Sequence, residues 1–75
     1  MLYVSGIANG KMVIRGIYQF RSTYGAPLDL IFEKLKENNM VPDWYYLLNQ
    51  IPPSKVSELK QAIIDVYGRD YLYNL

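Results

Sequence analysis

The amino-acid sequence predicts an α+β fold that is mostly helical, with an N-terminal β-hairpin packed on three short helices. Asn9-Gly10 lies between two stretches rich in β-branched and aromatic residues, which is typical of a tight hairpin turn. Pro27 and Pro52-Pro53 then divide the rest of the chain into segments whose apolar residues recur at helical spacing. Because 75 residues leave room for one hydrophobic core, we expect residues 1–75 to form a single small domain. With 51% hydrophobic and 20% charged residues, the chain is expected to fold.

The predicted hairpin joins residues 2–8 to residues 11–20. Asn and Gly tolerate the positive φ angles that a two-residue type I′ turn requires. Side chains alternate between the two faces of a strand, so the second arm sorts into two sets. The inward set is Met12, Ile14, Gly16, Tyr18 and Phe20, and the outward set is Lys11, Val13, Arg15, Ile17, Gln19 and Arg21. The outward face therefore carries every basic residue of this segment.

A helix over residues 9–24 is the alternative, and it makes the chain an all-α four-helix bundle. Such a helix would end at Gly25, a typical C-terminal glycine, just before Pro27. Its apolar stripe would comprise Val13, Ile17, Phe20 and Tyr24. It would also hold Gly16 and several β-branched residues in its interior, each unfavourable by up to about 1 kcal/mol relative to Ala. The hairpin is therefore the favoured interpretation.

The clearest helix is expected over residues 27–39, where Pro27 occupies an early position that needs no N–H. Asn38 or Asn39 can adopt the left-handed conformation that ends it. Its apolar stripe is Leu28, Ile31, Phe32 and Leu35.

Two further helices are expected on either side of Pro52-Pro53. The first covers residues 44–50 with Asp43 as its N-cap, and the second covers residues 55–67 with Ser54 as its N-cap and Gly68 just past its end. Their inward stripes are Trp44, Leu47, Leu48 and Ile51 in the first, and Val56, Leu59, Ile63 and Val66 in the second. Residues 69–75 form a tail whose aromatic and leucine side chains should dock on this chain or on another.

The composition argues against catalysis. The chain has no Cys and no His, which removes disulfides, thiolate metal sites and the usual general base. Asp29, Glu33 and Glu37 recur on the polar side of a helix, where a solvated face explains them best. The glycine spacing matches no nucleotide-binding loop. We therefore expect no enzyme, no cofactor and no metal.

The sequence also indicates where the protein acts. It contains no apolar run of the roughly 20 residues that cross a bilayer and no signal peptide, so we expect no membrane partner and an intracellular, cytoplasmic location. A short, cysteine-free chain rich in Tyr and Asn would be unsurprising for a virus or mobile element, which extends the expectation to a virion or host cytoplasm.

Aromatic residues give the leading functional hypothesis, a small protein-interaction module such as an adaptor, inhibitor or assembly component. Neighbouring residues on a helix step by about 100°, so Trp44, Tyr45 and Tyr46 cannot all point inward. Tyr is favoured at protein interfaces because it combines contact area with a polar group. The candidate interface for a protein partner or for self-association is Tyr45, Tyr46, Tyr71 and Tyr73.

The alternative hypothesis is a nucleic-acid-binding accessory protein. Residues 1–25 carry three basic side chains and no acidic one, although the whole chain has a net charge of only +1. A two-stranded ribbon can lie in a nucleic-acid groove and contact its phosphates. The candidate contacts are Lys11, Arg15 and Arg21, provided that all three project from one face of the hairpin.

Overall fold

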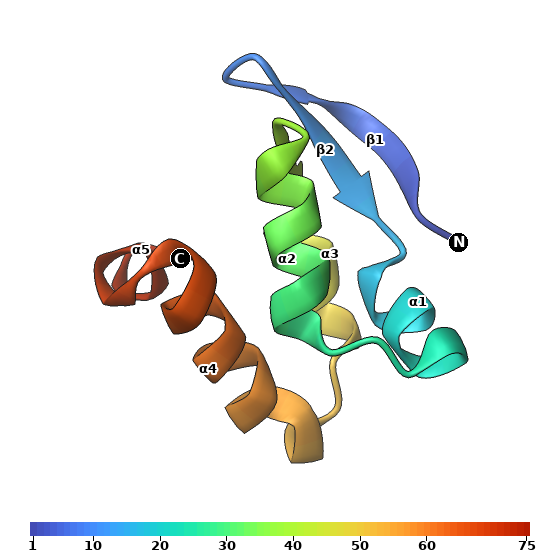
Figure 1. Cartoon of the computed structure of the whole chain (residues 1–75), viewed down its shortest axis with the longest axis vertical. Helices are drawn as coiled ribbons and strands as arrows, with labels where there is room; N and C mark the ends of the chain where they lie inside the picture. Colours follow the sequence, from blue (N-terminus) through green and yellow to red (C-terminus); the bar gives the residue numbers. More distant parts are fainter.

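The computed structural model describes residues 1–75 and confirms an α+β, mostly helical fold. A three-stranded sheet near the N-terminus packs beside five α-helices and one short 3₁₀ turn (Figure 1). The sheet excludes the four-helix bundle. The number of helices exceeds the three that the sequence predicted, because residues 17–24 and 69–73 are also helical.

The sheet is built on the predicted hairpin. Strand β1 (Tyr3–Ala8) pairs antiparallel with β2 (Lys11–Arg15), and the turn residues Asn9 and Gly10 have φ angles of 52° and 77°, both positive as a type I′ turn requires. A third strand that the sequence did not indicate, β3 (Met40–Pro42), pairs in parallel with β2. The strand order is β1-β2-β3, so β2 is central and β1 is an edge.

The second arm of the hairpin is shorter than predicted. It ends at Arg15, and the chain turns at Gly16, whose φ of 91° no other residue type adopts readily. Helix α1 (Ile17–Tyr24) follows and ends at Gly25, with a φ of 68°. The predicted strand is therefore wrong for residues 16–20, and the alternative helix is right for its second half. Ile17 is almost completely buried, because the turn directs it into the core.

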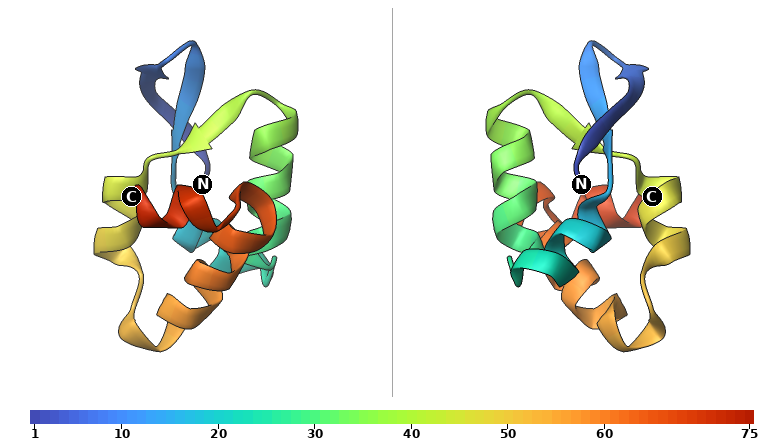
Figure 2. Two further views of the ribbon diagram at one scale, coloured as in Figure 1. Left: turned by 90° about the vertical axis from the view of Figure 1, so that its left-hand side faces the viewer. Right: turned by 90° about the vertical axis from the view of Figure 1, so that its right-hand side faces the viewer.

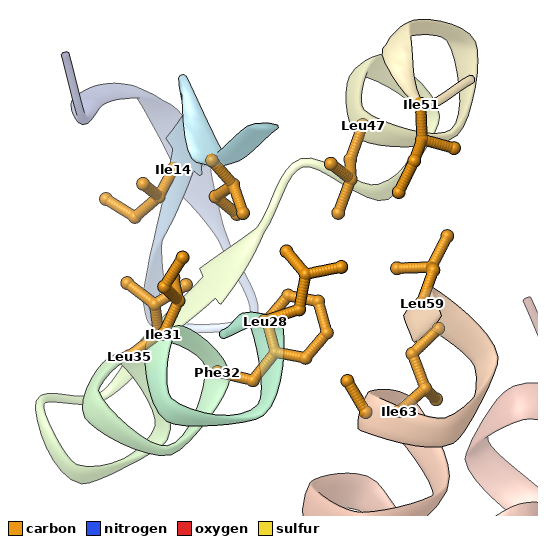
Figure 3. Packing of buried hydrophobic residues seen from close by; sticks show 11 residues of the cluster. Ile14, Leu28, Ile31, Phe32, Leu35, Leu47, Ile51, Leu59 and Ile63 are labelled. Carbon is orange, nitrogen blue, oxygen red and sulfur yellow. The ribbon is translucent and has the colours of Figure 1, made fainter. Parts of the chain in front are cut away.

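Helix α2 (Leu28–Glu37) matches the prediction closely. Pro27 precedes its first turn, and Asn39 takes the left-handed conformation after it, with a φ of 58°. All four residues of its predicted stripe are buried: Leu28, Ile31, Phe32 and Leu35. This helix forms the centre of the hydrophobic core (Figure 3).

Helix α3 (Trp44–Gln50) begins at the predicted cap. The Asp43 Oδ1 atom accepts a hydrogen bond of 3.2 Å from the backbone N–H of Tyr46. Leu47 and Ile51 are buried, as predicted, and Trp44 packs edge-on against Phe32 with ring centroids 5.3 Å apart. Leu48 is exposed, which corrects its predicted inward position.

The C-terminal part contains two helices. The 3₁₀ turn Pro53–Lys55 leads into α4 (Val56–Tyr67), so Ser54 lies inside that turn and does not cap the helix. Helix α4 buries Leu59, Ala62 and Ile63. After Gly68 the expected tail is a helix, α5 (Arg69–Tyr73), which packs back on the same chain.

The core is formed without β1. Its eleven buried residues come from α2, α3, α4, the start of α1, Ile14 of β2 and the residue that follows α3. Figure 3 shows Ile14 above Ile31 and Leu35, which places α2 against the central part of the sheet. Strand β1 lies on the side of β2 that faces away from α2 (Figure 1), and the hairpin projects beyond the helices (Figure 2).

Candidate functional site

The structure does not bring the three predicted nucleic-acid contacts together. Arg15 lies on β2, where its Nε donates to Asp43 Oδ2 at 2.8 Å. Arg21 lies on α1 and makes a two-pronged ion pair with Glu58 at 2.7 and 2.9 Å. Lys11 lies near the tip of the hairpin and forms no ion pair. The single basic face predicted for the hairpin is therefore wrong, because Arg21 does not belong to a strand.

Both arginines lower the pKa of the carboxylates with which they pair. The hydrogen bonds from Arg21 hold the pKa of Glu58 below its ordinary value of 4.5, and the hydrogen bond from Arg15 lowers the pKa of Asp43. The two carboxylates therefore stay charged well below neutral pH. Each arginine charge is already compensated within the fold, which leaves little for a phosphate to neutralise.

The four predicted interface tyrosines divide into two pairs. Tyr45 and Tyr73 are 81% and 80% exposed, as an interface role requires. Tyr46 is half-buried beneath the Arg15 guanidinium, 4.6 Å from its ring centroid, and the neighbouring Tyr3 hydroxyl raises the pKa of Tyr46. Tyr71 is also half-buried. Tyr46 and Tyr71 thus contribute internal contacts rather than a free surface.

Tyr71 belongs to an aromatic cluster that holds α5 in place. The Trp44 Nε1–H donates a 2.8 Å hydrogen bond to the Tyr71 hydroxyl, and Tyr71 stacks on Tyr67 with ring centroids 4.7 Å apart. Burial raises the pKa of Tyr67 to about 12. The docking predicted for the tail is confirmed, and it occurs on this chain.

The most unusual surface is β1 itself, which sequence reasoning did not single out. All six of its residues are exposed, and only one of its edges is paired. Natural edge strands are commonly protected by charged side chains, prolines or bulges. Strand β1 has a bulge between Val4 and Gly6, but it contains neither a charge nor a proline. Its other edge offers backbone donors and acceptors to any strand that approaches.

The side chains of β1 are uncovered on the face that should be internal. Val4 lies opposite Ile14, and Ile7 lies opposite Met12. Residues directly opposite in an antiparallel pair point to the same face of the sheet, so Val4 and Ile7 share the face on which Ile14 meets α2. Nevertheless Val4 is 51% exposed and Ile7 is 76% exposed, whereas Ile14 is buried. Helix α2 covers the central strand and leaves the edge strand bare.

An apolar hollow adjoins this bare face. It has a volume of about 190 Å³ and lies between the N-terminus, α1 and α2. Its lining is apolar except for Lys34 and comprises Leu2, Phe20, Ala26, Leu30, Ile31, Lys34 and Leu35. Leu2 precedes Val4 by two residues, so both project from the same face and connect the hollow to β1. We call the combined area of Leu2, Val4, Ile7, Met12, Phe20 and Leu30 the β1 surface.

A signal for the β1 surface exists in the sequence, although it is weak. Residues 1–10 contain no charged side chain. Whether such a strand is central or at an edge depends on strand order, which the sequence does not reveal.

No group of three or more His, Cys, Asp or Glu residues could hold a metal ion. The longest and most apolar helices still fall short of what is needed to cross a membrane. No protein-family model, curated protein or solved structure matches the chain.

Proposed function

We propose that this chain is a small, non-enzymatic protein-binding module whose contact area is the β1 surface. The observation that carries the proposal is the combination of an open strand edge with uncovered apolar side chains on its helix-facing side. An extended segment can add to such an edge through main-chain hydrogen bonds, while neighbouring apolar side chains supply affinity and selectivity.

The β1 surface supports this function better than the other two candidate surfaces do. Tyr45 and Tyr73 are exposed rings on short helices, with no open strand edge beside them. The basic residues favour nucleic acid less, because Arg15 and Arg21 are occupied by Asp43 and Glu58. Neither alternative combines an open strand edge with adjoining apolar area.

The proposal can be tested with a displayed library of extended peptides, selected for binding to the isotope-labelled protein. We expect bound peptides to shift backbone resonances of residues 2–8 and Met12. Ile7→Lys should weaken binding by roughly tenfold or more, because it places a charge among the apolar side chains of the contact. Tyr45→Lys is the matched control, since it introduces the same charge at another exposed ring, and it should leave binding unchanged.

The opposite pattern would reject the proposal. If Tyr45→Lys abolished peptide binding and Ile7→Lys preserved it, the contact area would be the aromatic one predicted from the sequence. If a protein that stayed monomeric bound no peptide, the chain would not be a strand-capturing module.

A further inference from the structure

We infer that the partner of the β1 surface is a second copy of this chain, paired antiparallel through β1 about a twofold axis. This inference rests on the proposed function and names its partner. The pairing joins two three-stranded sheets into one continuous sheet, in which each β1 becomes a central strand. A twofold contact uses the same patch on both copies, so the patch must be complementary to itself.

The edge of β1 meets that requirement. Residues 3–8 carry no charge, so an antiparallel pair of these strands places no like charges opposite one another. Each copy offers the same unpaired row of N–H and C=O groups. Main-chain pairing therefore satisfies both edges at once.

The uncovered face of β1 favours a second copy of the chain, rather than an isolated peptide strand, as the partner. A twofold axis perpendicular to a continuous sheet puts the helices of both copies on the same face. That is the face of Val4 and Ile7, which each copy's own α2 fails to cover. A second copy thus supplies a strand for the edge and sets its own Val4 and Ile7 beside those of the first copy, on a face that the helices of both copies flank.

The flank of α2 beside the hollow is also suited to an antiparallel copy of itself. It presents exposed Leu30 together with Lys34 and Glu37, which form an ion pair of 3.5 Å. Two such flanks face each other across the paired strands with apolar area and balanced charge rather than with a block of one sign.

A stable dimer needs only a modest share of the surface of this chain. A standard interface buries about 800 Å² on each partner, roughly a sixth of the 4839 Å² that this chain exposes. Residues 1–8 are all exposed, and the hollow extends the same area over α1 and α2.

Sedimentation equilibrium over a wide range of protein concentrations tests the inference. We expect a monomer–dimer equilibrium whose dissociation constant rises at least about tenfold in Ile7→Lys and stays unchanged in Tyr45→Lys. Amide exchange should show protection of β1 that increases with concentration. Circular dichroism verifies that the variants are folded, and Val4→Lys replaces Ile7→Lys if the latter unfolds.

Two results would overturn the inference. One is a monomer at every concentration, and the other is a dimer that survives both β1 variants but is lost in Tyr45→Lys. A monomer that still binds displayed peptides at β1 would leave the proposed function in place with a different partner. A monomer that binds none would end both proposals.

Discussion

Gly16 is the residue at which the chain turns from sheet to helix, and two constraints act on it. Its φ of 91° is unfavourable for any residue with a side chain, and the backbone carbonyl of Met1 occupies the place where a Cβ atom would stand. We therefore expect Gly16→Ala to cost about 1 to 2 kcal/mol in backbone strain and to displace Met1 and Leu2 as well. Gly25→Ala is the matched control, because Gly25 has a φ of 68° but open space around it. Urea unfolding should show the larger loss for Gly16→Ala, and equal losses would mean that the Met1 contact is unimportant.

The Arg21–Glu58 ion pair makes stability depend on acidity. Because its pKa is lower in the folded state than its ordinary value of 4.5, Glu58 binds a proton more readily when unfolded. Its contribution is fully present above that ordinary value and is lost as the pH falls through the lowered pKa of the folded state. In Glu58→Gln we expect lower stability at neutral pH and a flatter decline in the free energy of unfolding as the pH falls below 4.5. Glu33→Gln, at an exposed carboxylate, should retain the wild-type decline, and an unchanged decline in Glu58→Gln would contradict the assignment.

At the scale of elements, the sequence predicts what local chemistry determines. Asn9-Gly10 fixes the turn, the stripe of α2 is buried as expected, and Asp43 caps α3. The second arm of the hairpin was predicted to run through Gly16, where the strand in fact ends. A glycine can continue a strand in one backbone conformation and end it in another. The choice depends on burying Ile17, which is a tertiary contact.

The elements that sequence analysis missed depend on distant partners. Strand β3 has three residues and ends in Pro42, so it forms only because α2 returns the chain beside β2. The bare face of β1 has the same origin. The alternation of residues 2–8 indicates a strand, but only the placement of α2 decides that Val4 and Ile7 remain uncovered.

Helix α5 is held by a single side-chain hydrogen bond and a stack of rings, so its docking can be tested with two tyrosines. Tyr71→Phe removes the acceptor of the Trp44 Nε1–H and should cost about 1 kcal/mol, while preserving the stacked ring. Tyr73→Phe, at a ring that is largely exposed, should leave stability unchanged. Urea unfolding followed by Trp44 fluorescence would measure both variants, and equal stabilities would show that the hydrogen bond does not anchor α5.

At the scale of the whole molecule, the total exposed surface is ordinary for the mass of the chain. A folded monomer of 8.8 kDa is expected to expose about 4800 Å², close to the 4839 Å² of this chain. The fold is therefore as compact as its mass requires. Its exposed apolar residues include Tyr3, Val4 and Ile7 of β1, which stay uncovered because the helices pack on the other two strands.

The distribution of charge over the molecule leads to a last prediction, concerning nucleic acid. The net charge is +1, and two of the three basic residues near the N-terminus are held by Asp43 and Glu58. Binding of a mixed-sequence oligonucleotide depends on free cations that release counterions from phosphates, so we expect a dissociation constant weaker than about 10⁻⁴ M at physiological salt. Fluorescence anisotropy at several salt concentrations would measure it, with Lys11→Gln and Lys60→Gln compared as a hairpin variant and its helical control. Tight binding that falls steeply with salt, and whose salt slope Lys11→Gln alone reduces by about 1, would instead restore the hairpin as a nucleic-acid contact.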